Sequence, residues 1–143
     1  MRLTLVSSVA QGMKICEEGK DEAGVARCRE EIGLLYYNEG ECKAARGHLE
    51  AATKILSETT DKAAAARCTM HIGATHAASG EHTMAVATFK TALTVGESAP
   101  GGWSEKIDCL VALGASQIMS GDANSAIQSY NLATQMWQAK GNR

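Results

Sequence analysis

The chain has 143 residues, of which 45% are hydrophobic and 21% charged, so it is long enough to bury a core and too apolar to be disordered. Its formal net charge of −2 provides no basic patch for nucleic acid or for an anionic membrane surface. No apolar run reaches the ~18 residues that a membrane-spanning helix needs. We therefore expect a globular protein that binds no nucleic acid and does not insert into a membrane.

The first predicted helix covers residues 3–17 and copies a segment found later in the chain. When the sequence is shifted by 40 residues, Lys14-Ile15 falls on Lys54-Ile55. That later segment is the second helix of a predicted pair. We therefore expect 3–17 to be the second helix, or helix B, of an incomplete repeat.

Residues 21–58 form the first complete unit, with a predicted helix A at 22–38 and a predicted helix B at 41–57. Gly40 lies between them, where a residue with positive φ can close the first helix. Asp21 precedes helix A and is placed to cap its free N–H groups. The unit is thus predicted to be a helical hairpin.

The same unit returns at 61–97 and at 102–139, with predicted helices at 62–78, 81–96, 104–119 and 122–139. A fixed period in this range is typical of a solenoid, and the order of helices becomes B-A-B-A-B-A-B, about seven in all. The recurring residues are spaced by 40 and then 41 positions: Ile32-Gly33, Gly40, Ala45, Leu49 and Ala52; Ile72-Gly73, Gly80, Ala85, Phe89 and Ala92; Leu113-Gly114, Gly121, Ala126, Tyr130 and Ala133.

The first glycine of each unit lies inside helix A, where glycine costs ~1 kcal/mol relative to alanine. Because this destabilising glycine recurs in all three units, we expect one common reason for it, which is the close approach of helix B. We expect Ala45, Ala85 and Ala126 to pack against these glycines.

Five cysteines are an odd number without the spacing of a disulfide scaffold. Cys28, Cys68 and Cys109 recur with the repeat, which favours a packing role. Free thiols also favour a reducing compartment, so we expect a cytoplasmic protein. Regulation by cysteine oxidation stays open as an alternative.

These recurring residues resemble the tetratricopeptide repeat, a helix-turn-helix unit of usually about 34 residues. The longer period is similar to that of the Partner of Inscuteable (LGN-type) scaffolds and of rapsyn. The resemblance implies an all-α, right-handed α-solenoid of helical hairpins that forms a single domain over residues 1–143. The residues that match the opening of the longer repeats are Asp21, Gly24 and Ala26-Arg27 in the first unit and Asp61 and Ala66-Arg67 in the second.

In that family the A helices line a concave groove that holds a peptide. The resemblance makes this face of the chain mostly apolar, and it lacks the lysine and asparagine clamp with which chaperone-binding members hold a C-terminal carboxylate. The candidate groove residues are Arg27, Glu30, Leu34, Tyr37 and Asn38 from the first unit, Arg67, Met70 and Ala74, with Ala77 and Ala78, from the second, and Asp108, Val111, Ile118 and Met119, with Ala115, from the third.

Two interpretations of this face stay open. Arg27 and Arg67 could grip carboxylates or peptide carbonyls, or each could pair with a neighbouring acid such as Glu30. The apolar residues could accept an amphipathic helix, or they could pack between neighbouring A helices.

Cys68 and His71 have the spacing of metal ligands on one helix turn, and His76 follows, but a zinc site needs further ligands from another helix. A cysteine–histidine nucleophilic pair would likewise need a third group to orient the base. We therefore expect no enzyme, no metal and no cofactor.

The sequence predicts a protein–protein interaction module or scaffold that binds a peptide or helix of a partner on the concave face of the A helices. The alternative is a structural element that self-associates or stacks end to end through its terminal helices. The last predicted helix supports this alternative because no polar capping helix follows its apolar residues Ile127, Tyr130, Met136 and Trp137.

Overall fold

The computed structural model describes residues 2–141, with side chains from residue 4 onward, so residues 1 and 142–143 of the expected domain lie outside it. Within that range the chain forms only helices and turns, as predicted. The helices are α1 (Arg2–Glu18), α2 (Glu22–Asn38), α3 (Cys42–Ser57), α4 (Lys62–Ala78), α5 (His82–Glu97), α6 (Lys106–Met119) and α7 (Ala123–Gly141).

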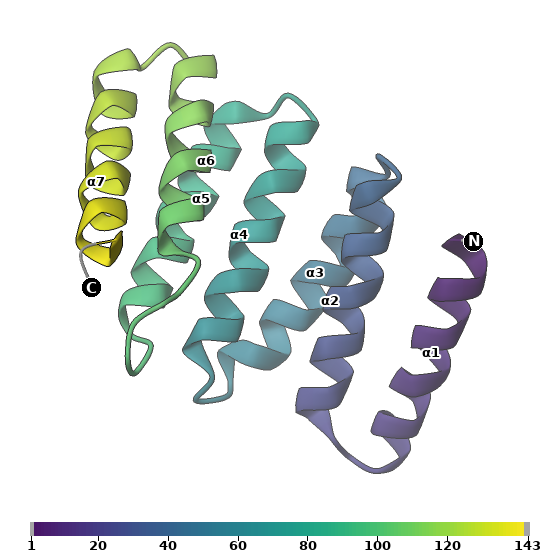
Figure 1. Cartoon of the computed structure of the whole chain (residues 1–143). Coiled ribbons are helices and arrows are strands. Elements are labelled where there is room, and N and C mark those ends of the chain that lie inside the picture. Colours follow the sequence, from purple (N-terminus) through teal and green to yellow (C-terminus); the bar gives the residue numbers. More distant parts are fainter. Residues whose placement is uncertain (1, 142–143) are drawn as a thin grey trace.

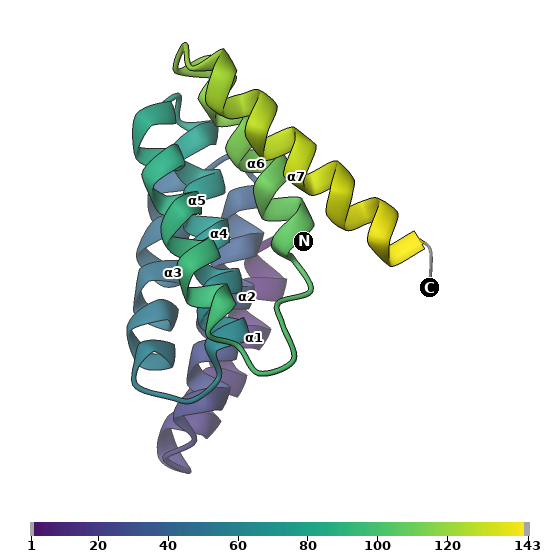
Figure 2. The same cartoon turned by 90° about the vertical axis from the view of Figure 1, so that its left-hand side faces the viewer.

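The helices stack unit by unit rather than around one closed centre. Each helix packs against the next one in the chain, and α4 also contacts α2 and α6. Helices α2, α4 and α6 thus form one layer, called the A layer below, while α3 and α5 lie behind it (Figures 1 and 2). The two ends of the chain lie at opposite ends of the stack (Figure 1). This arrangement confirms the predicted α-solenoid.

Helix boundaries follow the sequence pattern closely, and the largest shift is in the third unit. Helix α6 begins at Lys106, two residues after the predicted start. Gly101 and Gly102 have φ values of +79° and +90°, and they turn the connection so that Trp103 is buried before the helix begins.

The tight turns inside the hairpins have the predicted chemistry. Gly40, Gly80 and Gly121 have φ values of +81°, +80° and +89°, a region that favours glycine. At the start of α2 the Asp21 carboxylate accepts a hydrogen bond from the Gly24 N–H at 3.0 Å, and Asp61 caps α4 in the same way. These caps satisfy N–H groups that a helix leaves without internal partners.

Each hairpin is closed by a contact between a helical glycine and a bulky side chain. A Cβ atom at Gly73 would lie 2.7 Å from the Phe89 ring, closer than real Cβ contacts allow. Leu49 covers Gly33 and Tyr130 covers Gly114 in the same manner. The close approach predicted from the sequence is therefore present, but its nearest partner is the bulky residue one turn beyond the expected alanine.

Two clusters of buried side chains fill the joints between units. Small side chains dominate both clusters, which lets the helices pack closely. The first joint holds Ala26, Ala52, Leu56, Ala64, Ala65 and Cys68, and the second holds Ala66, Ala85, Phe89, Ala92, Trp103, Cys109 and Leu113. Cys68 and Cys109 are completely buried, as a packing role requires.

Candidate functional site

A hollow of about 350 Å³ opens on the A layer where α2, α4 and α6 come together. We call it the A-layer hollow. Small side chains create it, because alanine stands at most of the positions where α4 and α6 face the opening. Its lining consists of Tyr37, Ala74, Ala77, Ala78, His82, Phe89, Ala112, Ala115, Ser116 and Met119.

The chemistry of the A-layer hollow is apolar. None of its ten lining residues is an aspartate, glutamate, lysine or arginine. Tyr37 forms one wall from α2, and the exposed side chain of Met119 forms another from α6. Such a site can take up an apolar side chain by excluding water.

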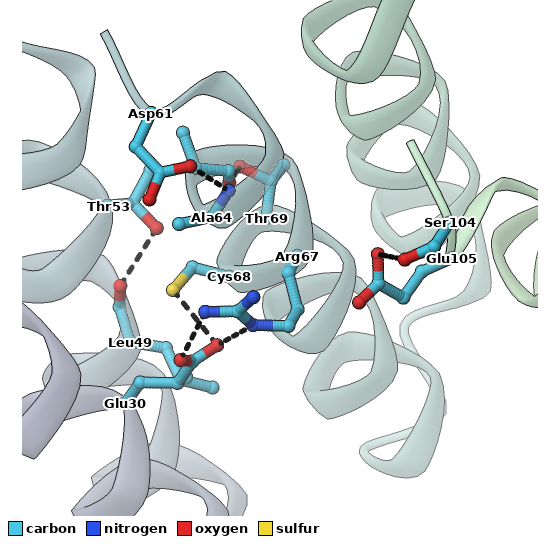
Figure 3. Close-up of polar contacts among 11 residues, drawn as sticks. Glu30, Leu49, Thr53, Asp61, Ala64, Arg67, Cys68, Thr69, Ser104 and Glu105 are labelled. Atoms are coloured by element: carbon cyan, nitrogen blue, oxygen red, sulfur yellow. Dashed lines mark hydrogen bonds and ion pairs between the residues drawn. The ribbon is translucent and has the colours of Figure 1, made fainter. Parts of the chain in front are cut away.

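A polar cluster lies at the opposite edge of the A layer, between α2 and α4 (Figure 3). The Arg67 guanidinium donates from Nε and Nη2 to the two carboxylate oxygens of Glu30, at 2.8 and 2.9 Å. The Cys68 thiol donates to the same carboxylate at 3.3 Å. Glu30 is only 5% exposed, so this carboxylate is enclosed by its own partners.

The cluster determines the charge state of each of its members. Burial by itself would raise the pKa of Glu30, but the hydrogen bonds and charge of Arg67, with the Cys68 thiol, hold that pKa below its usual value. Hydrogen bonding to Glu30 raises the pKa of Arg67. Burial and the Glu30 charge raise the pKa of the Cys68 thiol, so it stays protonated and poorly nucleophilic. Burial also lowers the pKa of the nearby His71.

The polar cluster decides between the two interpretations of one arginine. The Arg67 guanidinium pairs with the Glu30 carboxylate, so this arginine binds a neighbouring acid of its own chain, as one of the two interpretations expects. Arg27 lies exposed on α2, six positions after the capping residue Asp21. Of the two arginines, Arg27 is the more exposed, since Arg67 is partly buried against Glu30.

The structure distributes the remaining candidate residues over several places. Tyr37, Ala74 and Met119 line the A-layer hollow, together with the three expected alanines. Met70 packs against the core cluster of the second joint. Leu34 is half-buried, whereas Asn38 and Ile118 are exposed. These candidate residues therefore differ in burial, and Tyr37, Ala74 and Met119 are the ones that line the A-layer hollow.

Asp108 and Val111 lie in a second hollow of about 350 Å³, between α6 and α7. We call it the end hollow, because it lies within the last hairpin of the described stack, which α6 and α7 form (Figure 1). Ile107 contributes from α6, and Tyr130, Ala133, Thr134 and Trp137 contribute from α7. These two candidate residues are therefore separated from the A-layer hollow.

Sequence reasoning missed the residues at the floor of the A-layer hollow. His82 and Phe89 reach it from α5, and Ala112 and Ser116 lie on the inner side of α6. One signal was available, because Phe89 occupies the repeat position that covers the helical glycine. A ring in that position lies against α4 and can extend into the A layer.

Within residues 4–141 there is no group of three or more histidine, cysteine, aspartate or glutamate side chains that could hold a metal ion. Across the described chain, none of the helices combines the length and apolar character that crossing a bilayer demands.

Solved structures with the same architecture come from several organisms. BtubC (BKLC) from P. vanneervenii matches with a TM-score of 0.84 and 17% identity over 96% of this chain, which spans 57% of the length of that one. The TPR domain of Arabidopsis FLU matches with a TM-score of 0.72 and 15% identity, over 84% of this chain and 98% of that one. Repeats of a kinesin-light-chain-type protein from Podospora anserina match with a TM-score of 0.73 and 14% identity, over 99% of this chain and 69% of that one.

No curated protein sequence matches the chain at a significant level. The sequence profile of the tetratricopeptide repeat, in contrast, matches residues 63–139, which is more than half of the chain. Domains of that family generally mediate protein–protein interaction. Because this profile covers more than half of the chain, the chain belongs to the tetratricopeptide repeat family, and its stacked hairpins agree with that.

Proposed function

We propose that this protein is an interaction scaffold that binds a peptide or helix of a partner protein in the A-layer hollow. The observation that carries the proposal is the apolar lining of that hollow, drawn from three successive A helices. Peptide-recognition grooves commonly combine such an apolar depression with a few exposed polar groups at the rim. We further propose that the protein works in the cytoplasm, because its five cysteines are free thiols.

The partner segment has to bring a bulky apolar side chain. A hollow of about 350 Å³ with alanine walls is large enough for a leucine, phenylalanine or tryptophan anchor. Tyr37 supplies an aromatic wall for such an anchor, and Met119 supplies a flexible one. An amphipathic helix or a short apolar peptide fits this chemistry, whereas an acidic tail does not.

The test compares two substitutions of exposed alanines. Ala115→Phe fills the A-layer hollow from α6, while Ala87→Phe adds the same ring to the exposed surface of α5. Peptides selected from a displayed library against the wild-type protein are then measured against both variants. We expect Ala115→Phe to weaken binding about tenfold or more, and Ala87→Phe to leave it unchanged.

Circular dichroism can verify that the two variants are equally folded, so a difference in peptide binding between them reports on the binding site and not on folding. If selected peptides bind both variants as tightly as the wild type, the A-layer hollow is not their site. If they bind the Ala87→Phe variant poorly instead, the partner uses the α3–α5 side of the stack.

A second candidate function is assembly through the end hollow, and a comparison of equivalent positions favours it. Leu56 of α3 is 6% exposed beneath the next hairpin, whereas its equivalent in α7, Trp137, is 67% exposed. Ile127 and Leu132 add further exposed apolar surface to α7. A surface that is covered at an inner joint is therefore open at the end of the described stack.

Sedimentation velocity over a range of protein concentrations tests this second candidate. Self-association through α7 predicts a sedimentation coefficient that rises with concentration in the wild type and stays constant in Trp137→Gln. A wild-type protein that stays monomeric throughout would exclude self-assembly, while leaving peptide binding in the A-layer hollow untouched.

A further inference from the structure

Two half-buried cysteines face each other across the joint between α1 and α2. The Cys16 sulfur lies against α2, so close to Gly24 that a Cβ atom there would be 2.6 Å from it. Cys28 follows Gly24 by one helical turn on the same face of α2. Side chains of a helix point back toward its N-terminus, so the Cys28 sulfur is directed over the turn that contains Gly24 and toward Cys16.

The charge behaviour of Cys28 agrees with this geometry. Burial raises the pKa of the Cys28 thiol, and the adjacent Cys16 side chain raises it further by its charge and by a hydrogen bond. The position of the Cys16 sulfur against Gly24, one turn before Cys28 on the same face of α2, places the two side chains next to each other. The lack of a side chain at Gly24 permits this, because any larger residue would occupy the position of the Cys16 sulfur.

The same two cysteines are only half-buried, in contrast to the repeat equivalents of Cys28. Cys68 and Cys109 are completely buried, and their thiols donate to Glu30 and to the Phe89 carbonyl. Cys16 instead lines an open hollow of about 560 Å³ at the α1–α2 turn, with Glu17, Lys20 and Ile55 among its neighbours. A small oxidant can reach Cys16 without unfolding the stack.

We propose that Cys16 and Cys28 form a reversible intrachain disulfide that fastens α1 to the rest of the solenoid. The oxidant is a small disulfide of the glutathione class. The Cys16 thiolate attacks one sulfur of that disulfide and releases the first glutathione as a thiolate. The Cys28 thiolate then attacks the Cys16 sulfur of the mixed disulfide and releases the second. Two protein thiols lose their protons, and two electrons pass to the oxidant.

The consequence for the fold follows from the weak attachment of α1. None of its described side chains is fully buried, and α2 is the only described helix whose backbone lies beside it. Helices with few buried contacts open locally at little cost. A covalent bond between Cys16 and Cys28 closes a short loop across the turn and suppresses this opening. In a reducing compartment such a bond forms transiently, so it acts as a switch rather than as a permanent brace.

The test uses the full chain in glutathione buffers of increasing oxidised fraction at about pH 8.5, where thiolates are available. Wild-type protein is expected to lose about 2 Da and to yield one linked peptide that joins Cys16 to Cys28. Hydrogen exchange of the α1 amides is expected to slow about tenfold or more on oxidation, and to recover when a dithiol reductant is added.

Single variants identify the order of the two steps. Cys28→Ser should stop at a glutathione adduct on Cys16, whereas Cys42→Ser, which changes a half-buried cysteine on α3, should form the disulfide as the wild type does. A wild-type protein that accumulates the Cys16 adduct without closing the internal bond would overturn the proposal. So would linked peptides that join two chains, or an internal bond that leaves the exchange of α1 unchanged.

Discussion

The two inner joints of the stack use the same backbone arrangement with different chemistry. At the first joint, between α2–α3 and α4, the buried Glu30 carboxylate binds the Arg67 fork of the next unit. The equivalent residues of the second joint are Met70 and Asp108, which cannot form such a pair. There Met70 packs against a cluster that contains Trp103.

The second joint is closed by an aromatic side chain in place of the ion pair. The Trp103 ring lies directly on Gly96 and is 7% exposed. The glycine-rich connection before α6 delivers this ring, since Gly101 and Gly102 adopt positive φ values there. The comparison teaches that these hairpins can stack in two ways. The first joint depends on the charged state of the Glu30 carboxylate, whereas the second depends on the burial of apolar side chains.

The largest effect is expected at the second joint. Trp103→Ala removes a buried ring, and the cavity it leaves should lower the free energy of unfolding by about 3–5 kcal/mol. Urea denaturation followed by circular dichroism measures this loss. The loss should be concentrated in α6 and α7, which hydrogen exchange can resolve helix by helix.

Trp103→Phe is the matched control for that substitution. The Trp103 ring nitrogen is buried without a hydrogen-bond partner in the described part of the chain, so removing it leaves no new polar group unpaired. The control should cost less than about 1.5 kcal/mol. If Trp103→Phe destabilises as much as Trp103→Ala, ring burial does not explain this joint.

An intermediate effect is expected at the first joint. Glu30→Gln keeps the shape of the side chain but leaves the Arg67 charge without its partner. Breaking a fully buried pair costs about 3–5 kcal/mol, and because the Arg67 side chain is 37% exposed we expect about 2 kcal/mol. The double variant Glu30→Gln/Arg67→Gln should recover part of this loss of unfolding free energy, as measured by urea denaturation. Such a recovery would contradict a purely steric role of Glu30.

The smallest effect, and the sharpest distinction between the joints, is the response to acid. The pKa of Glu30 is lower in the folded chain than its ordinary value of 4.5, so its stabilising contribution is complete above about pH 4.5 and is lost as the pH falls through the folded pKa. The stability difference between wild type and Glu30→Gln should therefore shrink below about pH 4.

His71 adds a second acid-sensitive term at the first joint. Burial lowers its pKa below 6.5, so the unfolded chain takes up a proton more readily, and stability falls as the pH drops below about 6.5. Thermal melts from about pH 7 to pH 3 measure both windows. The difference between wild type and Trp103→Ala should stay constant over this range, and a parallel decline in both comparisons would show that the joints do not differ.

The sequence alone was sufficient for the helices and their order because the spacing of glycine and alanine records how hairpins close. Gly40 and its repeats mark the turns through their backbone conformation, and Asp21 marks a helix start through its cap. These are local signals, which explains why the observed boundaries differ from the expected ones by only a few residues.

The candidate site was predictable only in part, because contacts between units depend on the register of stacking. Tyr37, Ala74 and Met119 were assigned to one face by their repeat position, and they line one hollow. The Glu30–Arg67 pair joins residues 37 positions apart, and its burial follows from packing that no single helix encodes. Phe89 was identified only as a recurring bulky residue of the repeat, although it also lines the hollow.

The identical glycine turns within the three hairpins make those hairpins interchangeable as building blocks. An extra copy of the middle hairpin could be spliced into the chain without a new type of corner, since Gly40, Gly80 and Gly121 already share one backbone shape. The neighbours would limit where such a copy can go, because an acid like Glu30 has to meet an arginine from the adjoining unit. The contacts between neighbouring hairpins, and not the turns within them, therefore limit where the array can grow by duplication.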